Sequence, residues 1–230
     1  MKNKVESLAT PRLPASPNGI NGLDKINDGV VPAGRPTLVG GILKRLRAET
    51  QTHHMALESQ MPVMDPTFSL ADYRLLLTRF YGYYVPLEAR LVAWSRVEGR
   101  GMDYAERLKV PELERDLLAL GETADTIAML PHCDEIPELA TEAEGLGCLY
   151  VVEGSTLGGQ MITRQLQKSL GLSPESGVAF FHGYGSETGV RWQAFGRWLE
   201  EAAGRLEQDD AIIAGANETF RTLGDWLLAK

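Results

Sequence analysis

Residues 69–94 read SLADYRLLLTRFYGYYVPLEARLVAW, and their apolar side chains recur at intervals of three and four positions. This spacing places the apolar side chains on one face of an α-helix. The stripe consists of Tyr73, Leu76, Leu77, Phe80, Tyr84, Leu87, Leu91 and Trp94. Ser69 stands where an N-cap is expected, and Pro86 inside the stripe predicts a kink. The stretch therefore predicts one long amphipathic helix.

The same helical period extends on both sides of this stretch, and no part of the chain shows convincing β-alternation. Further helices are expected at residues 42–61, 111–121, 137–170, 187–206 and 212–227. The sequence therefore predicts an all-α protein of six to eight packed helices in one domain, residues 42–230.

Residues 1–41 differ from the rest, because prolines and glycines interrupt every period there. They predict a mobile N-terminal tail, with a regulatory arm as the alternative. The 230 residues are 43% hydrophobic and 23% charged, which is typical of a globular protein. A net charge of −8 argues against a nucleic-acid binder. No apolar run is long enough for a bilayer, no secretory signal is visible, and two cysteines make no disulfide framework, so we expect a cytoplasmic protein.

Residues 46–58, LRAETQTHHMALE, carry the first group of candidate functional side chains. Glu58 follows His54 by one helical turn, and Arg47 precedes it by two turns, so the three share a helix face. A metal-bound histidine usually gives its other ring N–H to a carboxylate. The alternative is a pair of surface histidines beside an ordinary i,i+4 partner. Periodicity does not choose between His53 and His54.

Residues 145–162, GLGCLYVVEGSTLGGQMI, carry the second group. Gly154, Gly158 and Gly159 lie in the middle of a stretch whose flanks are helical, and together they cost a helix about 3 kcal/mol relative to alanine. Ser155 and Thr156 can also bond back to the backbone. We expect the run to break or kink the helix, and to bare backbone against which a flat ligand can lie. Close helix–helix packing is the alternative.

Together the two segments resemble the haem (heme) oxygenases, most closely the bacterial branch that supplies biliverdin to bacteriophytochromes. One marker is L-R-x-x-T-x-x-x-H-x-x-x-E, running from Leu46 to Glu58, and the other is YVVEGSTLGGQ at residues 150–160. The resemblance covers residues 43–228. It implies a single helical bundle with haem between a proximal helix and a kinked distal helix.

The resemblance also assigns roles to residues. It makes His54 the proximal iron ligand, because only His54 has Thr50 and Glu58 at the expected spacing. It makes Glu58 the partner of that histidine and Arg47 a partner of a haem propionate. For the second propionate it suggests a basic residue on a late helix. Arg197 is the candidate and Arg191 the alternative.

By the same resemblance, the glycine-rich segment is the distal helix over the oxygen side of the haem. Gly154, Ser155 and Gly158 would act there as catalytic residues, and Gly159 would join Gly154 and Gly158 in binding haem. The animal enzymes have an aspartate where this chain has Ser155. How the distal water is anchored is therefore left open.

The implied activity is the O2-dependent opening of haem b, substrate and cofactor at once, to biliverdin with release of iron and carbon monoxide. Electrons would come from an external ferredoxin-like donor or reductase, and a bacteriophytochrome could receive the product. Neither a nucleic acid nor a membrane is expected as a partner. The alternatives are a non-catalytic haem carrier or sensor, and a related all-α family acting on a thiamin-like metabolite.

Two further features lead to expectations. Lys44, Arg45 and Arg47 cluster at the start of the first helix, where they form either a docking patch for an acidic electron donor or a solvated helix end. The run FFHGYG at residues 180–185 predicts a connection between helices. Its aromatic residues either close over the haem edge or join the core.

Overall fold

The computed structural model describes residues 41–98 and 101–229, and every regular element within these ranges is helical. The α-helices are α1 (Ile42–Gln60), α2 (Leu70–Val97), α3 (Val110–Ala119), α4 (Ala124–Ala128), α5 (Glu142–Leu170), α6 (Ala179–His182), α7 (Thr188–Leu206) and α8 (Asp209–Leu228). Short 3-10 turns are η1 (Pro62–Met64), η2 (Tyr104–Arg107) and η3 (Gly185–Glu187). The all-α prediction is confirmed. The expected tail lies outside the described residues, apart from Gly41.

Helix α2 begins where the sequence predicts, because Ser69 forms a capping box with Asp72. Pro86 lies inside α2 and has no N–H to donate to the carbonyl of Gly82. That carbonyl instead accepts a hydrogen bond from the backbone N–H of Cys133, at 2.9 Å. A side chain at Gly82 would overlap the carbonyl oxygen of Pro131. The segment before α5 therefore lies against α2 at the proline site.

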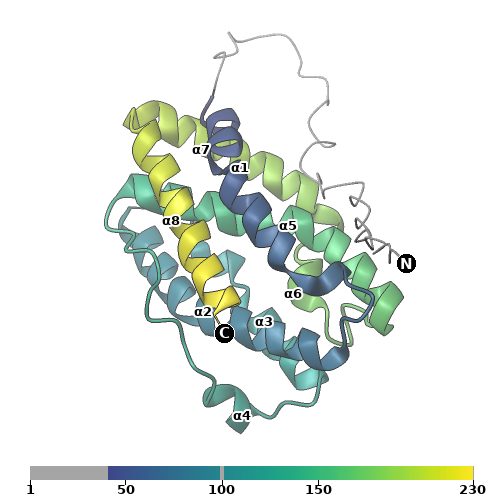
Figure 1. Ribbon diagram of the computed structural model, residues 1–230. Coiled ribbons are helices and arrows are strands. Elements are labelled where there is room, and N and C mark those ends of the chain that lie inside the picture. The colour runs from purple at the N-terminus through teal and green to yellow at the C-terminus, as the bar shows by residue number, and fades with distance from the viewer. Residues whose placement is uncertain (1–40, 99–100, 230) are drawn as a thin grey trace, which may run out of the picture. The chain divides into compact units, whose positions relative to one another are not determined.

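Helix α5 occupies the middle of the bundle, and α2, α7 and α8 all pack against it (Figure 1). It begins at Glu142, later than the predicted start near Pro137, because Thr141 and Glu144 form a capping box there. Glycines let neighbouring helices approach closely: a side chain at Gly145 would overlap Trp94, and one at Gly147 would overlap the Ile212 carbonyl.

Helix α5 continues through the glycine-rich stretch to Leu170, as the predicted range of residues 137–170 allows. Of the expected break or kink, the break is therefore wrong. The hydroxyls of Ser155 and Thr156 do bond back to the carbonyls of Val152 and Glu153, at 2.8 and 2.6 Å. This back-bonding does not interrupt the helix.

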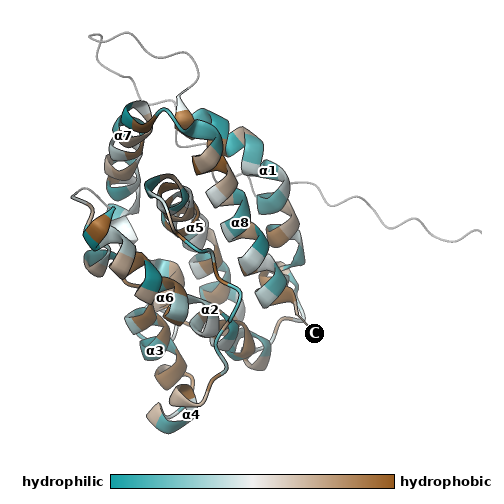
Figure 2. Ribbon diagram, turned by 90° about the vertical axis from the view of Figure 1, so that its left-hand side faces the viewer, coloured by the Kyte–Doolittle hydropathy of each residue, from teal (hydrophilic) through white to brown (hydrophobic). Residues whose placement is uncertain are grey.

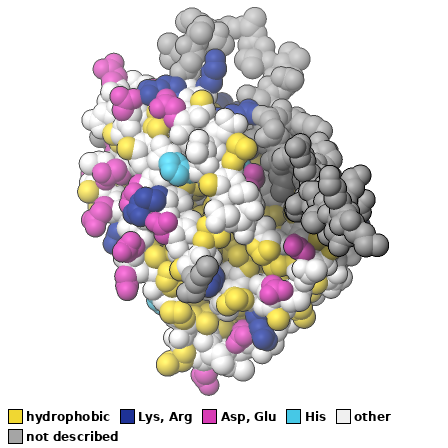
Figure 3. Space-filling view, viewed as in Figure 1, with side chains coloured by type: hydrophobic (Ala, Val, Ile, Leu, Met, Phe, Trp, Pro, Cys, Tyr) yellow, Lys and Arg dark blue, Asp and Glu magenta, His cyan; other side chains and the backbone are white. Residues whose placement is uncertain are grey.

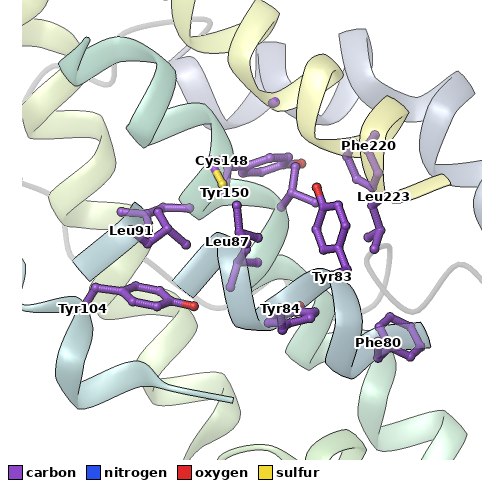
Figure 4. Close-up of a cluster of buried hydrophobic side chains, with 14 of the residues drawn as sticks. Phe80, Tyr83, Tyr84, Leu87, Leu91, Tyr104, Cys148, Tyr150, Phe220 and Leu223 are labelled. Atoms are coloured by element: carbon purple, nitrogen blue, oxygen red, sulfur yellow. The ribbon is translucent and has the colours of Figure 1, made fainter. Parts of the chain in front are cut away.

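The core lies between α2, α5 and α8, where aromatic and aliphatic side chains from the three helices interdigitate (Figure 4). Figure 2 shows hydrophobic and hydrophilic residues following one another along the helices, as expected of amphipathic helices. The stripe of α2 is buried along its whole length, from Tyr73 to Trp94. Those aromatic residues are therefore core residues, and none of them needs a ligand to explain its burial.

Helix α1 is fixed at its start by α7 and along its length by α8. The carboxylate of Glu200 in α7 accepts hydrogen bonds from the first backbone N–H groups of α1, those of Ile42 and Leu43, at 3.1 Å each. A carboxylate is favourable there because helix N-termini carry partial positive charge. Arg45 pairs with Asp209 and Asp210 at the start of α8. Helix α1 thus runs alongside α8 in the same direction.

Among the helices of residues 41–98 and 101–229, none combines the length and hydropathy needed to cross a lipid bilayer.

Candidate functional site

The two adjacent histidines of α1 have different environments. His53 is exposed, and its Nδ1 lies 2.9 Å from the side-chain oxygen of Asn217 in α8. His54 is about two-thirds buried, with 32% of its side chain exposed, and its ring meets Phe220 edge-on at a centroid distance of 5.8 Å. His53 is thus a surface residue with a hydrogen-bond partner, whereas His54 points toward the packed side of α1.

Burial sets the protonation of His54 and Glu58 in opposite directions. It lowers the pKa of His54, so the imidazole is neutral at neutral pH and keeps a lone pair for a metal. It raises the pKa of Glu58. The nearest atoms of the pair, Nε2 and Oε1, are 3.6 Å apart, which is longer than a hydrogen bond. The predicted proximity of the two side chains is therefore present, without a hydrogen bond between them.

A direct contact joins α1 to α5. Tyr150 of α5 is buried, which raises the pKa of its phenol, while a hydrogen bond with Thr50 and the charge of Arg47 act the other way. The hydroxyl of Thr50 bonds back to Leu46 within α1. From this contact both helices continue by one turn to His54 and to Gly154.

Gly154 and Gly158 of α5 share a half-buried face that is free of neighbouring atoms at Gly158. A side chain added to Gly158 would meet no atom within 4 Å. One added to Gly154 would meet only the ring of Trp192, at 3.7 Å. Packing against this chain therefore does not require glycine at either position. Such an open cradle suits a flat ligand that lies on the backbone.

Gly159 faces another neighbour. A side chain there would overlap the carbonyl oxygen of Phe181 in α6. The close approach of α6 accounts for this glycine without a ligand. The two alternatives that the sequence left open thus apply to different glycines: close packing explains Gly159, and an open face surrounds Gly158.

Ser155 lies on the exposed side of α5, beside the two open glycines. Its side chain bonds to Tyr84 of α2, whose phenol pKa is raised chiefly by burial. The phenol thus places a second polar group next to Ser155. Trp192 of α7 packs against Tyr150, with ring centroids 6.0 Å apart, and so borders the same region.

The basic residues expected around the site differ in their partners and in their exposure. Arg191 is engaged elsewhere, because it pairs with Glu187 at 3.1 Å and lies over the ring of Tyr184. Arg197 is exposed on α7, one turn before the Glu200 that caps α1. At the start of α1, Arg45 is paired with carboxylates on α1 and α8, which leaves less positive charge there for docking than the sequence suggests. Figure 3 shows acidic side chains mixed with basic ones at that edge of the molecule.

Sequence reasoning missed Phe220, Tyr84 and Trp192 as neighbours of the site. Each comes from a helix far along the chain from the residue that it contacts, and each lies in an apolar stripe that by itself indicates only a core position. Tyr150 stands within the quoted motif, but the motif does not reveal its bond to Thr50.

These observations define a class of protein: an all-helical bundle that pairs a half-buried, neutral histidine on one helix with an open glycine face on another. A family model described as heme oxygenase matches residues 41–229. A heme oxygenase of Xanthomonas campestris is 33% identical over 162 residues, which cover 69% of this chain and 90% of that protein. The chain belongs to the heme oxygenase family, whose members degrade haem.

Solved structures share the fold. The heme oxygenase of Leptospira interrogans superposes with a TM-score of 0.70 at 19% identity, over 81% of this chain and 98% of that one. The heme oxygenase of Neisseria meningitidis gives 0.64 at 22% identity, over 81% and 90%. Heme oxygenase-1 from Synechocystis, solved in complex with heme, gives 0.64 at 16% identity, over 81% and 90%.

Proposed function

We propose that this protein opens haem b to biliverdin, with release of iron and carbon monoxide, using O2 and electrons from an external donor. The proposal is carried by neutral, partly buried His54 on α1 together with the open Gly154–Gly158 face on α5, the helix that α1 contacts through Thr50 and Tyr150. The contact between Thr50 and Tyr150 lies one turn before both.

The residues present fit haem as the substrate. Gly158 has room where a side chain would stand, and the planar face of a porphyrin could occupy it. His54 would bind the iron through its neutral imidazole, and the carboxylate of Glu58 would stabilise the ring's orientation. Arg47 and Arg197 are the residues that we assign to the propionates, since guanidinium groups bind carboxylates well.

When bound, haem would supply the iron at which O2 is reduced, and its own ring would be the group attacked. The role of the protein side chains would be to prevent other reactions at the iron. Beside the two open glycines lie the hydroxyls of Ser155 and of its partner Tyr84. Hydroxyls can orient a water molecule and donate a hydrogen bond, but they are weak acids. Helix α5 would also cover part of the ring edge and so restrict where attack occurs.

We further propose that the electron donor is ferredoxin-like or a reductase, and that the product serves a bacteriophytochrome. The residue pattern at 150–160 supports the bacterial, phytochrome-associated branch. The competing function is a non-catalytic haem carrier or sensor, for which the same neutral histidine would serve equally well.

Haemin titration followed by ascorbate in air separates these functions. An oxygenase consumes the Soret band while a broad red biliverdin band grows, whereas a carrier keeps a stable Soret band under the same conditions. His54→Ala should abolish the wild-type Soret spectrum and turnover. His53→Ala, the matched control on the exposed side of α1, should preserve both. Identical spectra and turnover in the two variants would contradict the assignment of His54 as ligand.

A further inference from the structure

The segment that follows α5 turns back along the rear of its glycine-rich part. Residues 178–188, which include α6 and η3, contact α5 at four positions between Glu153 and Gln160. The Gln160 side chain donates to the carbonyl of His182 at 2.8 Å. The carbonyl of Phe181 lies against Gly159, and Gly183 lies beside Thr156. We call residues 178–188 the strap.

A buried carboxylate fastens one end of the strap. Glu153 is only 1% exposed and comes directly before Gly154. It accepts a hydrogen bond from the hydroxyl of Tyr184 at 3.0 Å and pairs with Arg107 at 2.8 Å. A buried carboxylate is tolerated when it is paired and hydrogen-bonded in this way, and removing a partner leaves it uncompensated.

Two cationic side chains also contact the ring of Tyr184. The ammonium of Lys109, which is 4% exposed, lies 3.8 Å from the ring centroid, and the guanidinium of Arg191 lies 4.5 Å from it. Cation–π contacts of this kind are strongest where water is excluded. Gly183 and Gly185 flank Tyr184 with φ of 55° and 56°, backbone values that favour glycine and let the chain turn sharply enough to place the ring.

Asp116 of α3 fastens the other end. Its carboxylate accepts hydrogen bonds from the backbone N–H groups of Ala179 and Phe180, at 2.7 and 2.8 Å. The strap is thus held at both ends by buried carboxylates from other helices, while its middle lies on the part of α5 with the lowest helix propensity.

We propose that the strap is the device that keeps α5 helical through Gly154, Gly158 and Gly159, with Glu153 and Tyr184 as positioning residues for haem on the opposite face. Three glycines cost a helix about 3 kcal/mol, yet α5 is continuous there. The strap contacts the rear of this stretch and leaves the Gly158 face open. The positioning part of this inference rests on the proposed function, whereas the effect on α5 does not.

Hydrogen exchange of the haem-free protein tests the effect on α5. Tyr184→Phe removes the hydroxyl and keeps the ring between its two cations, and Glu153→Gln removes the charge with little change of shape. In both variants, amides of residues 155–163 should exchange about tenfold faster than in the wild type, while amides of α8 stay unchanged. Tyr81→Phe is the matched control, because Tyr81 donates to Glu114 at 3.3 Å, away from α5. It should leave residues 155–163 at the wild-type rate.

Haem turnover tests the positioning role. With haemin and ascorbate, the ratio of biliverdin isomers should change in Tyr184→Phe and Glu153→Gln and stay at the wild-type value in Tyr81→Phe. A merely structural role would lower the yield without changing the ratio. Wild-type exchange rates at residues 155–163, or an equal rise in exchange rate throughout the molecule, would refute the proposal that the strap keeps α5 helical. Faster local exchange with an unchanged isomer ratio would overturn its positioning role. A wild type that binds no haem would refute the proposed function and leave the exchange test intact.

Discussion

Replacing each of the adjacent glycines 158 and 159 by alanine should change stability in opposite directions. In a helix interior, alanine is more favourable than glycine by about 1 kcal/mol. At Gly158 the new methyl group meets no atom within 4 Å, so the haem-free protein should gain most of that amount. At Gly159 the methyl group overlaps the carbonyl oxygen of Phe181, and overpacking of this kind costs about 1–3 kcal/mol. Gly159→Ala should therefore lose about 1 kcal/mol net.

Thermal unfolding of the haem-free variants measures this difference. For a protein of this size, 1 kcal/mol corresponds to a Tm shift of about 2–4 °C. Gly158→Ala should melt about 2–4 °C above the wild type and Gly159→Ala below it. Haemin titration then separates stability from binding, because Gly158→Leu should retain the higher Tm and lose haem affinity. Shifts of the same sign in the two alanine variants would refute the assignment of the faces. Wild-type haem affinity in Gly158→Leu would refute the haem-binding role of Gly158.

Two further predictions concern stability. Burial raises the pKa of Asp116 to about 6, against 3.8 for an unperturbed aspartate, so between these values the folded state holds more protons than the unfolded state. Stability should therefore fall as pH rises from about 4 to about 6, by an amount on the order of 3 kcal/mol. Asp116→Asn should flatten that slope in urea titrations, and an unchanged slope would contradict the assignment. Gly82→Ala should cost about 1 kcal/mol net, because the overlap of its methyl group with the carbonyl of Pro131 outweighs the better helix propensity of alanine. A Tm at or above that of the wild type would rule out this close approach.

The helices could be predicted from sequence because their signals are local. The apolar stripe of α2 and the Ser69 cap lie within one stretch of chain, and the structure confirms both. The range of α5 was also predicted from the local pattern, but the glycines within it predicted a break that the structure does not show. The groups that contact this part of α5, Tyr184 and Phe181 among them, come from a later segment and are not visible in the local pattern.

Within the candidate site, too, only the features with a local signal could be predicted from the sequence. Sequence spacing correctly placed Glu58 next to His54, since residues four apart on a helix are neighbours. Spacing could not tell the environment of His53 from that of His54, because the difference depends on Asn217 and Phe220 of α8. It likewise overestimated the positive charge at the start of α1, where Arg45 meets carboxylates from the other end of the chain.

The cap of α1 by Glu200 bears on how the protein assembles during synthesis. Glu200 follows Ile42 by 158 positions, so the ribosome makes α1 long before the carboxylate that completes its first turn. At about 5–20 residues per second, that interval is roughly 10–30 s. The α8 residues that pair with Arg45 emerge later still. The helix that carries His54 should therefore be among the last to dock. The proposed haem site between α1 and α5 would then be complete only once α7 and α8 have emerged.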